Sequence, residues 1–289
     1  MKFRNDIYQD LIEEILEDIF YEDTHFRTKI ALLRHYLEII VRTLIDRPLH
    51  DHMTLNDRKV KVKIFEIETN LKIGDKKIAR SIKNAADFLN IYSHTEQLAK
   101  ATNSDYALAL DHVMNVIALF FIIHFKNNQF GFKSHDMESF SILPPEVRYK
   151  TLDYLYKTDR NNLLILHKLC LVMLKFKGYS YAINWVRSNG RKLKKLSTYS
   201  KKYNFKPFLA KGKEMNGKIH LNMYDHLFFA INYVNKLRQA RKVPIYKSFE
   251  NSYKAYNIVC MNEKNKKSFE KSVEIKEMIE FLFIGRHKE

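Results

Sequence analysis

The sequence predicts a mostly all-α protein, and three observations carry this prediction. Only 7 glycines and 5 prolines occur among 289 residues, which leaves little material for the turns of a many-stranded sheet. Hydrophobic residues make up 46% of the chain and recur at helical spacing in several long segments. A chain of this length can bury a sizeable core without metals or disulfides. We therefore expect two helical domains, residues 1–143 and 144–289.

The first domain is predicted to begin with two helices. An acidic helix covers about residues 5–22, and a long one runs from Thr24 to Ile45 because its apolar residues form a helical stripe. Residues 58–74 are ambiguous, since their valines and isoleucines alternate as in a strand but also keep a helical face. We favour the helix for this segment.

Two more helices complete the expected bundle. One covers Asp75 to Leu89, and the last begins with Ser104 as its N-cap and carries a strongly apolar face. Its most apolar run, residues 113–125, is too short to span a bilayer and holds two polar side chains. It is typical of a buried core helix in a four-helix bundle.

The domain boundary is placed at Pro144 and Pro145, which disfavour helix before them and can open the next one. Beyond it we predict an amphipathic helix over residues 224–242 and a final helix from Ser268 to Phe283 that caps the second domain.

Electric charge divides the chain unevenly. Residues 1–144 hold 19 Lys and Arg against 21 Asp and Glu, whereas residues 145–289 hold 31 against 12, so the second half carries the whole excess of the net +17. A basic half of this kind is typical of a protein region that meets a polyanion.

Several function classes lack support. Cys170 and Cys260 form neither a disulfide framework nor a CxxC pair, and the acidic N-terminus is unlike a signal peptide, so we expect a reducing cytoplasm and no membrane. The adjacent side chains in the His-Asp-His run at 50–52 rarely close a metal site by themselves, so we expect no metal. No P-loop, GxGxxG or GxSxG occurs, and no cofactor is expected.

The first domain also resembles a known family. Its long helix carries LLRHYLEIIVRTLI, a later one ends in ADFLNIYSH, and a further helix closes the set. This order, over about residues 24–127, resembles the prokaryotic HEPN-type helical domains of ribonucleases in toxin-antitoxin, abortive-infection and CRISPR systems. Such domains carry an Arg-polar-xxx-His motif, and here Asn90 and His94 match its second part, while Leu89 replaces the arginine.

The resemblance implies metal-independent RNA cleavage by the 2′-hydroxyl, which needs a base, an acid and a cation for the phosphorane. His94 would shuttle the proton and Asn90 would orient it or hold a phosphate oxygen. Glu38 would be the partner of His94, or simply a solvated ion-pair partner of Arg34 four residues before it. Arg80 or Lys83, from the same helix as the motif, would supply the cation in a dimer. The alternative is that Asn90 and His94 only satisfy backbone groups at a helix end.

The second domain contains a basic segment, VRSNGRKLKKLSTYSKKYNFKPF, at residues 186–208. It has no acidic residue, and aromatic rings interleave its cations, as expected for a groove that binds single-stranded nucleic acid. A solvated flexible loop is the alternative. The predicted binding residues are Arg187, Arg191, Lys192, Lys194, Lys195, Tyr199, Lys201, Lys202, Tyr203 and Lys206.

The charge and the basic segment predict a protein that binds RNA or single-stranded DNA. The resemblance implies a bacterial or phage-related defence or toxin system, with metal-independent endoribonuclease activity as the candidate chemistry. The resemblance implies a homodimer. The alternative is a non-catalytic adaptor that dimerises through a degenerate HEPN-like bundle, while the basic half docks DNA or an acidic protein.

Overall fold

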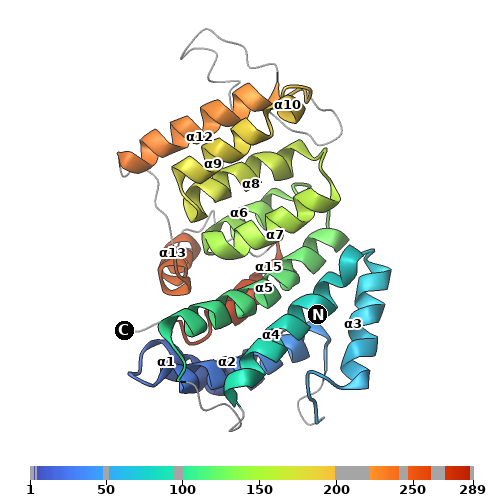
Figure 1. The fold of residues 1–289 in the computed structure, drawn as a ribbon, viewed down its shortest axis with the longest axis vertical. Coiled ribbons are helices and arrows are strands. Elements are labelled where there is room, and N and C mark those ends of the chain that lie inside the picture. The colour runs from blue at the N-terminus through green and yellow to red at the C-terminus, as the bar shows by residue number, and fades with distance from the viewer. Residues whose placement is uncertain are drawn as a thin grey trace. The chain divides into compact units, whose positions relative to one another are not determined.

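The protein is all-α, as predicted, in the computed structural model (Figure 1). The structure describes residues 3, 5–47, 52–93, 100–198, 222–240, 247–261 and 271–286. Within these residues the only elements besides α-helices are a short 3-10 helix, η1 (Gly74–Lys76), and one isolated bridge between Ser197 and Asn222.

The chain separates into two compact units. Unit 1 comprises Met1–Gln129 and Phe249–Glu289, and unit 2 comprises Phe130–Ser248. This division differs from the expected one at both ends of the second domain. The boundary precedes Pro144 by a whole helix, and the C-terminal segment belongs to unit 1, where its apolar side chains are buried.

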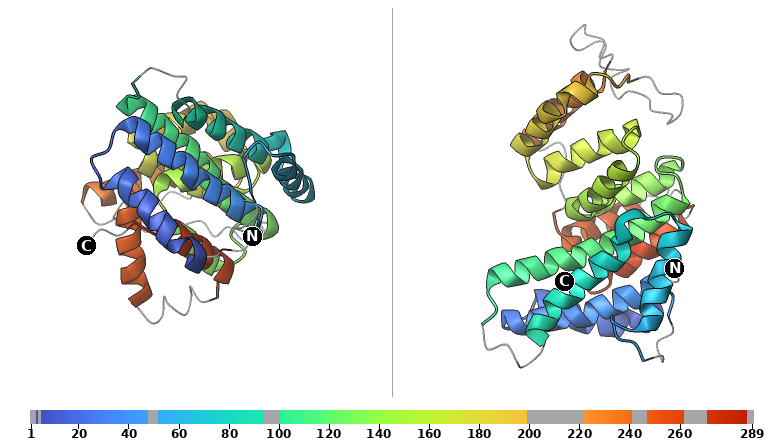
Figure 2. Two further views of the ribbon diagram at one scale, coloured as in Figure 1. Left: turned by 90° about the horizontal axis from the view of Figure 1, so that it is seen from below. Right: turned by 45° about the vertical axis from the view of Figure 1, so that its right-hand side comes forward.

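Unit 1 is a helical bundle built around α2, which packs on α1, α4 and α5 (Figure 2). The apolar stripe predicted for α2 is its buried face, and the helix spans nearly the expected residues. The helices of this unit are α1 (Asn5–Phe20), α2 (Phe26–Leu44), α3 (Arg58–Asn70), α4 (Lys77–Ser93), α5 (Asn103–Asn127), α13 (Phe249–Met261) and α15 (Val273–Phe283).

The ambiguous segment at 58–74 is a helix, α3, as favoured from the sequence. Its Glu68 is buried, and the Oε1 atom accepts hydrogen bonds from the backbone N–H groups of Ile78 and Ala79 at 2.6 and 3.1 Å. A carboxylate at this place accepts hydrogen bonds from otherwise unpaired N–H groups in the first turn of α4. Its negative charge also interacts favourably with the positive end of the α4 dipole. Glu68 thus fixes the start of α4 from a neighbouring helix.

The last predicted helix of the bundle, α5, starts earlier than expected. Thr102, not Ser104, is its N-cap, and Thr102 forms a reciprocal capping box with Asp105. From Val116 to Phe125 every side chain of α5 is buried. Within the described residues α5 is the one helix long and apolar enough to cross a bilayer by composition, and it packs on α2 and α4 as a core helix.

The C-terminal segment is anchored in unit 1 by polar and aromatic contacts. The Arg286 guanidinium is 2% exposed and lies over the rings of Phe20 and Phe249, at 4.2 and 4.8 Å from their centroids. Gly285 precedes it with a φ of 65°, and a Cβ there would lie 3.0 Å from the Cα of Glu13, so only glycine fits. Because these contacts reach α1, the segment folds with the N-terminal half.

Unit 2 is a second stack of helices, in which α8 packs on α7, α9 and α12. Pro145 occupies the first turn of α7, as predicted from the double proline. Between α8 and α12, the buried rings of His167 and His226 share a hydrogen bond of 3.0 Å between Nδ1 of His167 and Nε2 of His226. The helices are α6 (Ser134–Ile142), α7 (Pro145–Thr158), α8 (Leu163–Phe176), α9 (Tyr179–Ser188), α10 (Gly190–Leu193) and α12 (Met223–Gln239).

Candidate functional site

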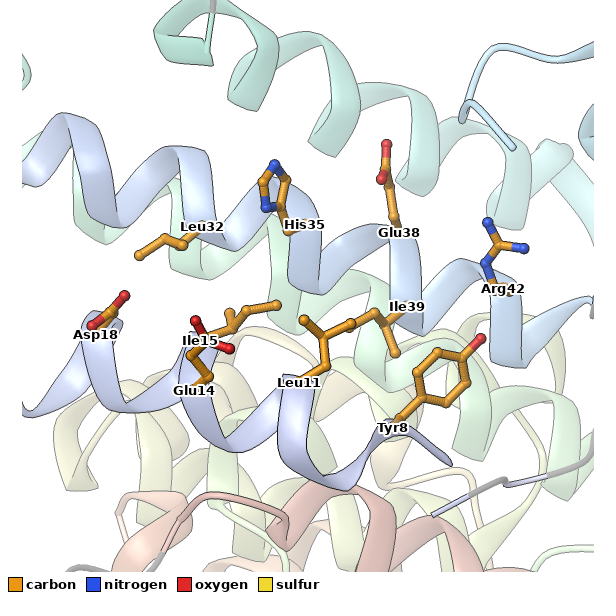
Figure 3. A pocket seen from close by; sticks show the side chains of 10 residues that line it. All are labelled: Tyr8, Leu11, Glu14, Ile15, Asp18, Leu32, His35, Glu38, Ile39 and Arg42. Carbon is orange, nitrogen blue, oxygen red and sulfur yellow. The ribbon is translucent and has the colours of Figure 1, made fainter. Parts of the chain in front are cut away.

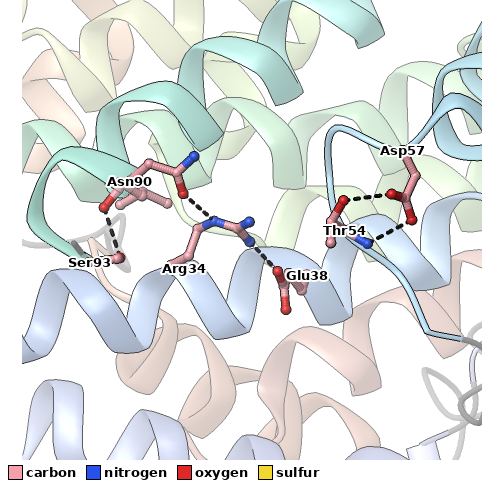
Figure 4. A network of polar contacts seen from close by, with 7 residues as sticks. Arg34, Glu38, Thr54, Asp57, Asn90 and Ser93 are labelled. Atoms are coloured by element: carbon pink, nitrogen blue, oxygen red, sulfur yellow. Dashed lines mark hydrogen bonds and ion pairs between the residues drawn. The ribbon is translucent and has the colours of Figure 1, made fainter.

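Two of the predicted catalytic residues lie in one polar cluster between α2 and α4. Arg34 donates a hydrogen bond from Nε to Oδ1 of Asn90 at 2.9 Å, and its Nη1 contacts Oε1 of Glu38 at 2.5 Å (Figure 4). Arg34 therefore bridges the two residues singled out in the sequence. The predicted ion pair of Arg34 with Glu38 is confirmed. His94 lies outside the described residues.

The backbone around Asn90 is held by further bonds. Arg27 of α2 donates from Nε to the carbonyl oxygen of Tyr92 at 3.1 Å, and the Ser93 hydroxyl donates to the carbonyl oxygen of Leu89 at 3.0 Å. Two arginines of α2 thus contact the last turn of α4. The position of Asn90 is therefore set by α2 as well as by its own helix.

Leu89, which stands where the resembled motif has arginine, is 0% exposed and belongs to the core of unit 1. A side chain at this position is therefore buried rather than exposed to solvent. The guanidinium at Asn90 comes from Arg34 of α2 instead. The cations proposed from α4 have other surroundings: Lys83 pairs with Asp87, and Arg80 is exposed.

A groove of about 390 Å³ runs between α1 and α2 beside this cluster, and Glu38 is part of its wall (Figure 3). His35 and Arg42 line it from α2, and both point to the same side of the helix as Glu38. The exposed imidazole of His35, next to Arg34 in sequence, was not singled out as a candidate. Its place on the polar side of α2 follows from the spacing of three from Glu38.

The cluster offers a guanidinium, a carboxylate and a carboxamide within one contact chain. The side chain of Arg34 is 14% exposed, so its charge is only partly screened by water. A guanidinium in this setting can bind a phosphate oxygen through the N–H groups that its protein partners leave available. The geometry is therefore compatible with an anion held near Asn90.

A second candidate site lies in unit 2, where basic side chains of α9 and the turn after α10 meet aromatic rings of α12. The Arg187 guanidinium carbon lies 6.0 Å from the ring centroid of Phe228, and Lys194 Nζ lies 5.1 Å from that of Tyr224. The rings of Tyr224 and Phe228 are stacked with centroids 6.2 Å apart. We call Arg187, Lys194, Tyr224 and Phe228 the cation-aromatic cluster.

The other predicted binding residues divide into two groups. Those that follow Arg187 as far as the end of the described segment are exposed cations: Arg191, Lys192, Lys194 and Lys195. The remainder lie outside the described residues: Tyr199, Lys201, Lys202, Tyr203 and Lys206.

The aromatic half of the cluster was not predicted from the sequence. Tyr224 and Phe228 are four apart on α12, a spacing that places them on one helix face and that was visible in the sequence. The contact of Lys194 with the Tyr224 ring could not be predicted, because it joins two elements whose close packing involves Gly190. A Cβ at Gly190 would lie 3.2 Å from the Tyr224 ring, so this glycine allows close approach of α10 to α12.

The division into units sharpens the uneven charge. Unit 2 contains 24 Lys and Arg and 7 Asp and Glu, whereas unit 1 contains 26 of each kind. The entire net charge of +17 therefore belongs to unit 2. Residues 249–289 were counted with the basic half in the sequence. They belong to unit 1, so their charged residues, acidic ones included, are counted there.

Comparisons with known proteins give no relative: no protein-family model, no curated protein sequence and no solved structure matches this chain.

Proposed function

We propose that the protein binds single-stranded nucleic acid, RNA foremost, through the exposed basic face of unit 2. The observation that carries this proposal is the cation-aromatic cluster, in the unit that holds all of the net positive charge. Lys and Arg release counterions when they neutralise phosphates, and half-exposed rings offer stacking faces to unpaired bases. The alternative, a solvated flexible loop, would account for the cations but not for the stacked aromatic rings beside them.

The test is the salt dependence of binding to a fluorescent single-stranded RNA, with a DNA of the same sequence alongside. If about six phosphates are neutralised, affinity falls roughly a thousandfold between 50 and 200 mM salt. Replacing Arg191, Lys192, Lys194 and Lys195 together by alanine should weaken binding to all sequences alike. Binding that ignores salt, or that is absent at low salt, contradicts the proposal.

Metal-independent RNA cleavage is a second candidate function, and the contact between Arg34 and Asn90 favours it. Arg34 supplies the cation that the motif lacks in its own helix, and by resemblance to HEPN domains His94 serves as the proton carrier. Incubation with RNA in EDTA should then yield fragments that end in a cyclic phosphate. The variant His94→Ala should abolish them without loss of binding. Cleavage that persists in this variant, or that requires a divalent metal, rejects the mechanism.

From the same resemblance we propose that this activity belongs to a bacterial or phage-related defence or toxin system in the cytoplasm, and that unit 1 self-associates around Asn90 and His94. Ile91, 38% exposed beside Asn90, is a contact residue for such a dimer. Light scattering at micromolar concentration should give a dimer, and Ile91→Glu should dissociate it, while Ile258→Glu on the exposed face of α13 should not. A dimer without cleavage activity favours the alternative of a non-catalytic adaptor whose basic unit docks DNA or an acidic protein.

A further inference from the structure

A small pocket inside unit 2 gathers three cations. It has a volume of about 110 Å³ and lies among α6, α7 and α8. Arg148 of α7 and Lys168 and Lys175 of α8 line it, together with Ser141 and apolar side chains, and none of the described residues that line it is acidic. The pocket is distinct from the cation-aromatic cluster, which α9, the turn after α10 and α12 form.

Arg148 is the most buried of the three cations, with 8% of its surface exposed. Its Nε atom is buried and has no hydrogen-bond partner within the part of the chain that the structure describes. Acids on the same helix are used elsewhere, since Glu146 pairs with Lys150 at 3.5 Å and Asp153 pairs with Lys157 at 2.6 Å. Among the described residues, no carboxylate forms an ion pair with Arg148.

The electrostatics of the pocket reflect this absence. Burial lowers the pKa of Arg148 to about 10, and burial followed by the positive charges of Arg148, Lys168 and Arg238 lowers that of Lys175 to about 8. The pKa of Lys168 is also lowered, by burial and then by Arg148. Buried charges are ordinarily paired, because an unpaired charge loses its hydration and gains no attraction to a partner that would offset this cost. Three partly or fully buried cations that share one pocket therefore favour an anion as its ligand.

We propose that this pocket binds a phosphate group, as the free ion or as the terminal monoester of a nucleotide or nucleic acid. Its volume equals that of roughly three to four water molecules, which admits a phosphate group but not a nucleoside. A nucleoside or oligonucleotide carrying the group would therefore remain outside. The planar guanidinium of Arg148 suits two phosphate oxygens, and the two ammonium groups neutralise the remaining charge. Phe130, Phe140 and Val172 in the wall keep water away and strengthen each contact.

This inference goes beyond the proposed function, because the pocket would bind phosphate even if unit 2 met no nucleic acid. The experiment is calorimetry of inorganic phosphate with the full-length protein, against chloride at the same ionic strength. Phosphate should bind with measurable heat at one site. The variants Lys168→Met and Lys175→Met should each weaken binding roughly tenfold or more, the loss typical of one hydrogen-bonded charge. The exposed Lys157→Met in α7 is the matched control and should change nothing.

Two further ligands identify the source of the group. A nucleoside 5′-monophosphate and an oligonucleotide with a 5′-phosphate, compared with its 5′-hydroxyl form, are titrated under the same conditions. Preference for the 5′-phosphorylated oligonucleotide, lost in Lys175→Met, supports the end of a nucleic acid as ligand. Preference for the mononucleotide supports a free nucleotide. Phosphate binding no stronger than that of chloride, or equal loss in Lys157→Met, overturns the proposal.

The variant Arg148→Met separates a binding role from a structural one. Because a buried charge without an ion-pair partner costs stability, the variant should melt at the wild-type temperature or a few degrees above it in phosphate-free buffer. It should also lose the rise in melting temperature that phosphate gives the wild type. A fall in melting temperature with an undiminished response to phosphate contradicts the proposal.

Discussion

Arg34 and Asn90, 56 residues apart in sequence, are joined by a hydrogen bond of 2.9 Å between Nε and Oδ1. The bond brings a guanidinium from α2 to the residue that precedes His94 by four positions in the sequence. It also leaves Asn90 with its amide N–H groups available, because its oxygen accepts from Arg34. The position of Asn90 and the positive charge beside it therefore depend on α2 and α4 together.

The first prediction concerns Arg34 itself. Arg34→Lys keeps the charge but loses the planar fork, and Arg34→Ala loses both, so RNA cleavage should fall about 100-fold or more, as for removal of a preorganised donor. Binding to unit 2 should persist in both variants. Arg80→Ala, an exposed arginine of α4, is the control and should retain activity. Equal loss from Arg80→Ala would assign the cation to α4.

The second prediction concerns Leu89. Because the side chain is 0% exposed, Leu89→Arg places an unpaired charge in the core and should destabilise unit 1 by about 3 to 5 kcal/mol, with no gain of cleavage. Leu89→Met, which conserves volume, should cost less than about 1.5 kcal/mol. Thermal unfolding followed by circular dichroism measures both. An active Leu89→Arg protein of normal stability would show that position 89 does face the cluster.

The third prediction separates stacking from charge in unit 2. Phe228→Leu should weaken RNA binding by about 1 to 3 kcal/mol for a stacked base and leave the salt slope unchanged. Lys195→Ala should instead lower the salt slope by about one. Phe132→Leu is the matched control, since Phe132 is 81% exposed in the same unit but outside the cation-aromatic cluster. If Phe228→Leu changes the slope and not the affinity at fixed salt, the rings do not stack with bases.

The fourth prediction is a loss of stability in acid, caused by the histidines between α8 and α12. Burial, then the charges of His226 and Lys168, lower the pKa of His167 to about 3. An unfolded histidine takes up a proton near pH 6.5, so the unfolded state binds more protons than the folded one between about pH 6.5 and 3. This contribution to stability is complete above pH 6.5 and declines by about 1.4 kcal/mol per pH unit below it.

Urea unfolding at pH 7, 6 and 5 measures this decline. The protein has a single tryptophan, Trp185 on α9, so its fluorescence reports unit 2 alone. The double variant His167→Gln and His226→Gln should flatten the dependence between pH 7 and 5. His135→Gln, on α6 of the same unit, is the control and should keep it. An unchanged slope in the double variant would assign the acid sensitivity to other groups.

The predictability of the site from sequence depended on whether a feature was local. Asn90 was predicted from the motif and Glu38 from the resemblance, and the ion pair of Glu38 with Arg34 follows from a separation of four residues. The bond from Arg34 to Asn90 was not predicted, because no short-range pattern relates positions on two different helices. The start of α5 was misplaced by choosing Ser104 over Thr102, and the capping box with Asp105 was the signal overlooked.

The sequence by itself determined that the chain is helical and that its charge is uneven, since periodicity and composition are properties of contiguous residues. Only the tertiary structure decided where the C-terminal segment belongs, because its fate depends on contacts of Arg286 with Phe20 and Phe249 across the chain. Likewise Arg148 and Lys175 are ordinary basic residues in the sequence. They became a candidate anion site because the packing of α7 on α8 buries both charges where no acid neutralises them.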